Sequence, residues 1–130
     1  MKLKYATLLT AVALAAPAFA DDHASGDAAA GEKAFNQCKA CHMIGEGASN
    51  RVGPHLNDVI GRTAGTIDGF RYSRQMVEAG EGGLVWTTQT IHDFLSQPRD
   101  YIQGTKMSFS GFRDEADIAA VTAYLTTFSE

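Results

Sequence analysis

The sequence has only two cysteines among 130 residues, and no run in which apolar and polar residues alternate as in a half-buried strand. It also lacks internal repeats and low-complexity tracts. Basic residues are scarce after residue 20, where nine Lys and Arg stand against 15 Asp and Glu, a net charge of −6. This charge argues against a nucleic-acid partner. The longest apolar run, from Ala6 to Ala16, is shorter than the roughly 20 residues of a membrane span.

The first twenty residues have the three parts of a cleavable secretory signal. Lys2 and Lys4 give a basic start, an apolar stretch follows, and Ala18-Phe19-Ala20 matches the small-residue cleavage pattern. We therefore expect cleavage after Ala20 and, in a Gram-negative cell, export to the periplasm. An uncleaved anchor is the alternative. Residues 21–26 are expected to form a flexible arm, and residues 27–130 a single domain.

The two cysteines stand three positions apart and are followed at once by a histidine, in Cys38-Lys39-Ala40-Cys41-His42. On a helix, positions i and i+3 share a face, so both sulfurs would point the same way. This C-x-x-C-H pattern is typical of c-type haem attachment, in which the thiols form thioethers and the histidine binds the iron. A redox-active dithiol, half of a zinc site and a short disulfide are the alternatives. The chain lacks the βαβ context and the second ligand pair that the first two need.

All 13 glycines lie after residue 20, and many of them fall between positions 45 and 83. A segment so rich in loops cannot easily bury a core of its own. A large, flat, apolar cofactor would supply the missing apolar surface, because small domains commonly need such support.

Apolar periodicity and capping residues predict an all-α fold with long loops. Asp27 should cap the first helix, Thr87 or Thr88 a later one, and Asp114 the last. Gly31 lies inside the first helix, where glycine costs about 1 kcal/mol against alanine, so we expect another helix to cross closely there. The expected helices cover residues 28–39, 72–79 with a stop at Gly80, 88–97, 99–102, and a last segment with Ile118, Val121, Leu125 and Phe128 on one face. Pro98 either ends the third of these helices or starts another.

Several short motifs stand in one order around the haem motif. They are Lys33-Ala34-Phe35-Asn36-Gln37, Gly53-Pro54-His55-Leu56, residues 60–66, residues 69–73, Trp86, Phe94-Leu95, residues 98–101, residues 104–109 and Ala123-Tyr124-Leu125. Over roughly residues 27–128 the chain resembles a class I c-type cytochrome, close to the bacterial cytochrome c2 and mitochondrial types. The resemblance implies a small single-domain fold in which three to five helices and long loops wrap around one covalently bound haem.

By this resemblance, His42 is the proximal ligand of the haem iron and Met107 the ligand on the opposite face. A His/Met pair suits electron transfer, because a thioether ligand raises the reduction potential. The carbonyl of Pro54 should accept a hydrogen bond from the other ring nitrogen of His42. Further expected haem contacts are Cys38, Cys41, Leu56, Phe94, Leu95, Thr105, Lys106 and Phe109, with Arg62, Tyr72 and Trp86 as donors to a buried haem propionate.

The other candidate ligands are less well placed along the chain. Met43 adjoins His42 and is badly placed to reach the opposite haem face, and Met76 is expected in the core. His55 should lie at the surface or at the haem edge, and His92 on a solvated helix face. Where the terminal helices cross, Gly31 and Phe35 should meet Tyr124 and Leu125.

Two departures from the family pattern affect the side of the haem where Met107 lies. Phe94 stands where many relatives have a tyrosine that can bond the ligating sulfur, and Met76 stands where asparagine is common. Both changes make this pocket less polar. We therefore expect the Met107–iron bond to lack one hydrogen bond, which would shift the reduction potential.

The resemblance implies a soluble periplasmic one-electron carrier and not an enzyme, because a six-coordinate iron leaves no open position for a substrate. Its expected donor is a bc1-type complex, and its acceptor a terminal oxidase or a photosynthetic reaction centre. The alternatives are a dedicated electron acceptor of one periplasmic dehydrogenase and a gas-binding or peroxidase-like haem protein. The monomer would dock transiently at the haem edge, where the candidate basic residues are Lys33, Lys39, Arg51, Arg99 and Lys106.

Overall fold

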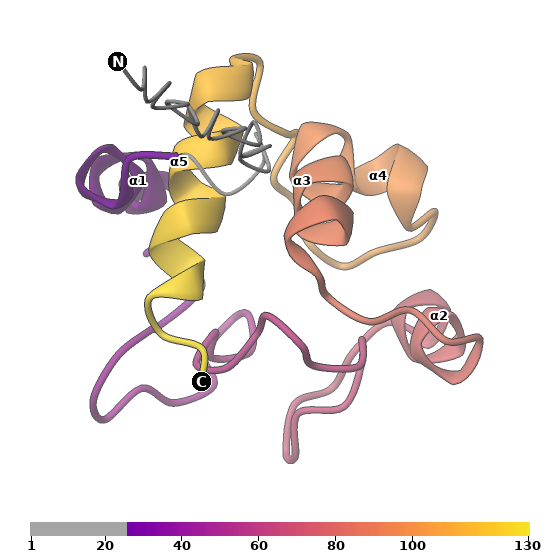
Figure 1. The fold of residues 1–130 in the computed structure, drawn as a ribbon. Coiled ribbons are helices and arrows are strands. Elements are labelled where there is room, and N and C mark those ends of the chain that lie inside the picture. Colours follow the sequence, from indigo (N-terminus) through magenta and orange to yellow (C-terminus); the bar gives the residue numbers. More distant parts are fainter. Residues whose placement is uncertain (1–25) are drawn as a thin grey trace, which may run out of the picture.

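The structure, a computed structural model, describes residues 26–130 (Figure 1). The expected signal, and His23 in the expected arm, lie outside these residues. The described part contains five α-helices, one short 3-10 helix and no strand, which confirms the prediction of an all-α fold with long loops. The helices are α1 (Ala28–Ala34), η1 (Phe35–Gln37), α2 (Arg74–Glu81), α3 (Thr88–Ser96), α4 (Pro98–Tyr101) and α5 (Glu115–Thr126).

The three predicted caps are confirmed. The Asp27 carboxylate accepts from the backbone N–H of Ala29, and the Asp114 carboxylate caps α5 in the same way, each over 2.9 Å. Thr87 caps α3 through a capping box, in which its hydroxyl accepts from the backbone of Thr90 while the Thr90 hydroxyl accepts from the backbone of Thr87. These bonds satisfy N–H groups that the first helical turn leaves without a partner.

The ends of two helices differ from the expectation. The first helix does not continue to residue 39: after Ala34 the chain tightens into η1, and the N–H of Cys38 bonds the carbonyl three residues back, over 2.8 Å. Gly80 does not stop α2 but lies inside it, because the helix packs there directly on the backbone of Ala64. The short α4 begins at Pro98, one of the two possibilities for this residue, which suits the first position of a helix because its missing N–H is not needed there.

The two terminal helices cross as predicted, and Figure 1 shows α1 passing steeply across α5. A methyl group on Gly31 would fall on the carbonyl oxygen of Ala120 and 2.7 Å from Cβ of Tyr124, so only glycine allows this approach. The rings of Phe35 and Tyr124 lie 5.3 Å apart. Leu125 belongs to the same buried core as Phe35. The crossing therefore fixes where the chain enters the C-x-x-C-H segment.

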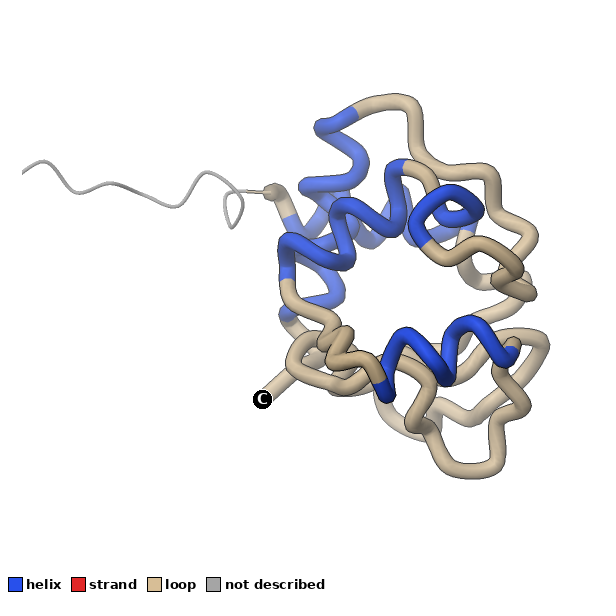
Figure 2. Tube along the Cα trace, turned by 90° about the vertical axis from the view of Figure 1, so that its right-hand side faces the viewer, coloured by secondary structure: helices blue, strands red, loops and turns tan. Residues whose placement is uncertain are grey.

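The segment that contains α2 lies opposite the other helices, and Figure 2 shows α2 on one side of the molecule with the remaining helices on the other. Backbone bonds join this segment to the start of α3. The N–H of Trp86 donates to the carbonyl of Arg62 over 2.8 Å, and that of Ala64 donates to Leu84 over 2.9 Å. Among residues 26–130, no helix has the length and apolar character that would let it cross a membrane.

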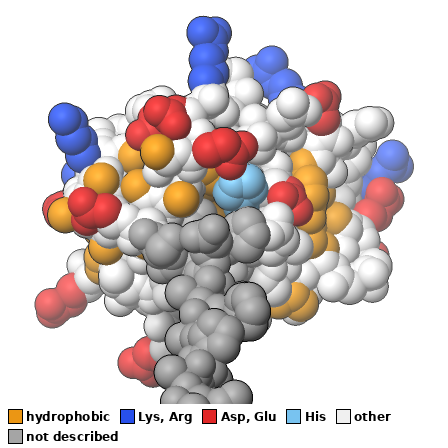
Figure 3. Space-filling model, turned by 45° about the horizontal axis from the view of Figure 1, so that its top comes forward, with side chains coloured by type: hydrophobic (Ala, Val, Ile, Leu, Met, Phe, Trp, Pro, Cys, Tyr) orange, Lys and Arg blue, Asp and Glu red, His pale blue; other side chains and the backbone are white. Residues whose placement is uncertain are grey.

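Charged side chains are not evenly distributed over the surface. Asp114, Glu115 and Asp117 gather at the start of α5. Figure 3, which brings the upper part of the molecule toward the viewer, shows acidic side chains both in the middle of that face and at its margins, whereas the Lys and Arg side chains lie at its margins.

Candidate functional site

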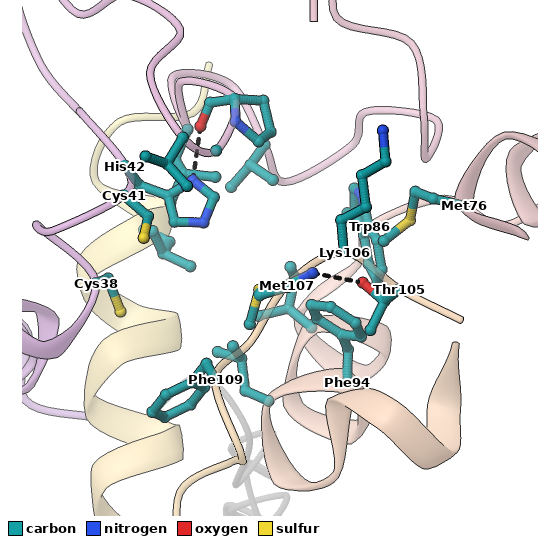
Figure 4. A pocket seen from close by; sticks show the side chains of 18 of the residues that line it. Cys38, Cys41, His42, Met76, Trp86, Phe94, Thr105, Lys106, Met107 and Phe109 are labelled. Carbon is teal, nitrogen blue, oxygen red and sulfur yellow. Dashed lines mark hydrogen bonds between the residues drawn. The ribbon is translucent and has the colours of Figure 1, made fainter. Parts of the chain in front are cut away.

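A cavity of about 370 Å³ lies between α2, α3, α5 and the long loops, a size within the usual range for small-molecule sites. The structure brings every residue predicted for the haem site to the wall of this one cavity (Figure 4). They are Cys38, Cys41, His42, Pro54, Leu56, Arg62, Tyr72, Trp86, Phe94, Leu95, Thr105, Lys106, Met107 and Phe109.

The two cysteines are not joined by a disulfide and share one side of the cavity. The backbone of the motif makes a single helical turn, in which the N–H of Cys41 and that of His42 both donate to the carbonyl of Cys38, over 3.1 Å and 2.9 Å. This turn directs both sulfurs the same way, as i, i+3 spacing requires. In the unreacted side chain, burial together with the neighbouring Cys41 raises the pKa of Cys38 to about 11.

The imidazole of His42 is held by one ring nitrogen and offers the other to the cavity. Its Nδ1–H donates to the carbonyl oxygen of Pro54 over 2.7 Å, as the family resemblance implied. Burial lowers the pKa of His42, although the bond to Pro54 acts in the opposite direction. The ring is therefore neutral, and its Nε2 has a free lone pair. A neutral imidazole whose second nitrogen is anchored in this way is a usual ligand of protein-bound metals.

Met107 reaches the cavity from the side opposite His42 (Figure 4). The loop that carries it is tied at three points. The N–H of Met107 donates to the Thr105 hydroxyl over 3.2 Å, Lys106 Nζ donates to the carbonyl of Arg71 over 3.1 Å, and Arg99 donates to the carbonyl of Ser108 over 3.1 Å. Hydrogen bonds at residues 106, 107 and 108 therefore hold the loop and position the thioether of Met107.

Arg62 and Tyr72 form a polar part of an otherwise apolar wall. The Arg62 guanidinium donates to the carbonyl of His55 over 3.2 and 3.3 Å, and the Tyr72 hydroxyl accepts from the N–H of Ile67 over 3.2 Å. Burial lowers the pKa of Arg62 and raises that of Tyr72. A guanidinium has five donors and a phenol can still donate its own proton, so both can serve a buried carboxylate.

The wall near Met107 is apolar, as the sequence departures indicated. Phe94 is buried against the ring of Trp86, with 5.1 Å between centroids, and its other neighbour is Tyr101 at 6.2 Å. Met76 is buried in the core cluster and also lines the cavity, which agrees with its expected place.

The remaining candidate ligands are not brought to the cavity. Met43, His55 and His92 do not line it. His92 lies on a partly exposed face of α3, where its Nε2 is 2.7 Å from a carboxylate oxygen of Glu115 and so links α3 to α5. The two residues are 23 positions apart, and only the fold brings them together.

Several wall residues carried no signal that assigned them to a cofactor. Ile91 and Val121 were predicted as apolar helix faces, and their periodicity cannot tell a core from a cavity wall. Gly53 was interpreted only as part of a turn. Val52 is an apolar side chain 77% exposed at the edge of the cavity, and no pattern in the sequence marks it. Ser73 was not marked either, although its hydroxyl caps α2.

These groups fit a haem. Two thiols on one side, a neutral imidazole and a thioether on opposing walls, and a half-buried guanidinium match the two thioether bonds, the two iron ligands and one of the two propionates of haem c. The apolar remainder of the wall suits the porphyrin face. Haem attachment therefore accounts for the cysteine pair better than a dithiol or a zinc site, neither of which uses a distant thioether.

Comparison with known proteins gives the same answer. The sequence profile of the cytochrome c family matches residues 28–129. Cytochrome c2 of Afifella marina is 55% identical over 100 residues, which cover 77% of this chain and 81% of that protein. Cytochrome c2 of Agrobacterium tumefaciens is 52% identical over 100 residues, which cover 77% and 90% of the two chains. A solved structure of cytochrome c2 from Rhodospirillum centenum matches with a TM-score of 0.78 at 41% identity, over 81% of this chain and all of that one. One haem c is therefore attached covalently through Cys38 and Cys41, and the chain belongs to the cytochrome c family as a member of class I.

Proposed function

We propose that this protein is a soluble, exported one-electron carrier whose haem iron is held by His42 and Met107. Haem supplies the metal centre that gains and releases one electron. The chain's own residues orient the imidazole, hold the thioether, accept the propionate charge and exclude water from the two faces.

The opposition of His42 and Met107 across one cavity is the observation that supports this function best (Figure 4). Two anchored ligands on opposite sides leave no open coordination position, which favours electron transfer over catalysis or gas binding. The names of the relatives agree, since those compared above are called cytochrome c2.

The proposed partners are membrane redox complexes, a bc1-type donor and an oxidase or reaction-centre acceptor, reached in the periplasm by transient docking at the haem edge. Lys106 lines the cavity, and Lys39 and Arg51 adjoin the wall residues Ala40 and Val52. Basic residues beside the site support electrostatic steering, which increases association rates and weakens as salt rises. Turnover with a purified partner should therefore slow as the salt concentration rises, and an absent salt response would exclude steering.

The exported protein tests the assignment directly. Intact mass should show loss of residues 1–20 and gain of one haem. The oxidised protein should have the deep-red band of a sulfur–iron bond, and the reduced protein should not bind carbon monoxide. Exported protein that matures without haem would refute the carrier function, and carbon monoxide binding by the unmodified protein would favour the gas-binding alternative.

Two methionines line the cavity, which provides a matched pair of variants. Met107→Leu should abolish the deep-red band, permit carbon monoxide binding and lower the midpoint potential by at least about 59 mV, a tenfold change in a one-electron equilibrium. Met76→Leu replaces a buried methionine of the same cavity and should keep the band. If Met107→Leu keeps it, residue 107 is not the ligand.

A further inference from the structure

Gly53 is buried against one face of the His42 imidazole. A methyl group built on its Cα would fall on Cε1 of that ring, 2.7 Å from Nδ1 and 2.8 Å from Nε2. Carbon atoms normally approach to about 3.5–4.0 Å. The backbone of residue 53 therefore fills the space beside the ring, and any side chain there would occupy the place of the imidazole.

Hydrogen bonds on both sides keep Gly53 in this position. Its N–H donates to the carbonyl of Cys41 over 2.9 Å, and its carbonyl accepts from the N–H of Arg51 over 2.9 Å. The next residue, Pro54, accepts from Nδ1 of His42. Two hydrogen bonds thus join residues 51–54 to the haem motif. Pro54 binds the edge of the His42 ring, and Gly53, beside the face of that ring, binds the backbone of Cys41.

The need for glycine at position 53 comes from the ring and not from the backbone. Residue 53 is not among the glycines with a left-handed φ, so its backbone conformation is open to alanine. The three atoms that an added methyl group would meet first all belong to His42. A substitution here therefore acts on the imidazole before it acts on anything else.

We propose that Gly53 is a positioning residue that fixes the rotation of the His42 ring about its Cβ–Cγ bond. Pro54 sets the direction of the ring within its own plane, and Gly53 sets the tilt of that plane by closing one face with backbone. The inference rests on the proposed function in one respect, since it takes His42 as an iron ligand. The orientation of an axial imidazole plane controls how unpaired spin spreads over a ferric haem, and hence the pattern of shifted haem methyl signals in its NMR spectrum.

The test compares three one-methyl variants of the mature, haem-loaded protein. Gly53→Ala touches the ring. Gly80→Ala presses a methyl group onto the backbone of Ala64 and should lower stability without reaching His42. Gly82→Ala adds a methyl group at an exposed helix end with φ −76°, where its nearest neighbour lies 3.3 Å away. Proton NMR of the oxidised proteins gives the methyl pattern, and chemical denaturation gives the stability.

We expect Gly53→Ala alone to change the order or spread of the haem methyl shifts. Gly80→Ala should lower stability and keep the wild-type pattern, and Gly82→Ala should keep both. A wild-type pattern in Gly53→Ala, or the same altered pattern in Gly80→Ala, would overturn the inference. Failure of the proposed function is a separate result, because the unmodified protein would then lack the deep-red band.

A measurement on the unmodified protein keeps the inference testable if Gly53→Ala does not mature. In the reduced, diamagnetic protein, the Cα protons of Gly53 should give a nuclear Overhauser effect to the ring proton on Cε1 of His42, because the two groups are in contact. They should also show the ring-current shift of protons above an aromatic face. Absence of both signals would show that residue 53 does not cover the ring.

Discussion

Replacing Gly31 by alanine should weaken the crossing of the two terminal helices. The new methyl group would fall on the carbonyl oxygen of Ala120, 2.6 Å from its carbonyl carbon and 2.7 Å from Cβ of Tyr124. Since carbon atoms prefer about 3.5–4.0 Å, the helices would have to move apart by about 1 Å. Overpacking of this kind costs about 1–3 kcal/mol, and the better helix propensity of alanine returns about 1 kcal/mol. Because the obstacle is backbone, we expect a net loss of about 1–2 kcal/mol.

Guanidinium chloride titration of the haem-loaded protein, followed by circular dichroism, measures this loss. With a slope of about 3 kcal/mol per molar, the midpoint should fall by about 0.3–0.7 M for Gly31→Ala. Gly82→Ala is the matched control, since it adds the same group at an exposed helix end and should leave the midpoint almost unchanged. If Gly31→Ala unfolds at the wild-type midpoint or above it, the close approach of α1 and α5 does not limit the residue at this position.

Three further outcomes follow from the structure. Phe94→Tyr should raise the midpoint potential by about 20–60 mV, the equivalent of one hydrogen bond of about 0.5–1.5 kcal/mol donated to the Met107 sulfur. An unchanged potential in redox titration would show that residue 94 does not tune the iron through this sulfur. A double-mutant cycle on His92→Ala and Glu115→Ala should give a coupling energy of about 0.5–1 kcal/mol in denaturation, and a coupling of zero would mean that the 2.7 Å contact adds no stability. Burial raises the pKa of each described tyrosine, so phenolate absorbance should develop only above pH about 10. Stability should fall as the pH rises past that value, because the unfolded chain releases these protons first. A titration curve like that of free tyrosine would exclude the effect. These tyrosines are Tyr72, Tyr101 and Tyr124.

The helix starts could be predicted from the sequence because capping is a local interaction. Asp27 and Asp114 each bond a backbone N–H two residues further on, and Thr87 one that is three residues on. Such bonds depend on the spacing of neighbouring residues and hardly on the rest of the fold. A helix end needs more information, because the first helix tightens after Ala34 to suit the packing of Phe35 and the turn that follows it.

The glycines show where local reasoning fails. Gly80 was expected to stop α2, but its function is to let that helix touch the backbone of Ala64. Gly53 was interpreted as part of a turn before Pro54, but it also lies on the imidazole face of His42. A glycine required for a close approach looks the same in the sequence as one required for a turn, and only the distant partner tells them apart. The partner of His92 could not be predicted for the same reason, since Glu115 is on another helix.

The membership of the site was predictable because the family resemblance places residues along the chain, and all of those it named lie on one cavity. The roles of these residues remain predictions. Only one of the predicted contacts between them, the hydrogen bond from His42 to the carbonyl of Pro54, is seen directly in the described residues. The sequence could not give the rest of the wall. Val52 and Ser73 come from loops and caps whose side chains follow no period, so nothing in their spacing indicates a cavity.

The position of the cavity ties stability to redox chemistry in this protein. Helix contacts join α1, α3, α4 and α5, while α2 lies on the opposite side of the molecule (Figure 2). Met76 of α2 and Phe94 of α3 both line the cavity, so a haem there would supply apolar core that neither element has alone. A substitution in the wall should therefore change both the unfolding free energy and the midpoint potential. Gly80→Ala acts outside the wall, so it should lower the unfolding free energy and leave the midpoint potential unchanged. This contrast separates a residue that tunes the haem from one that only supports the fold.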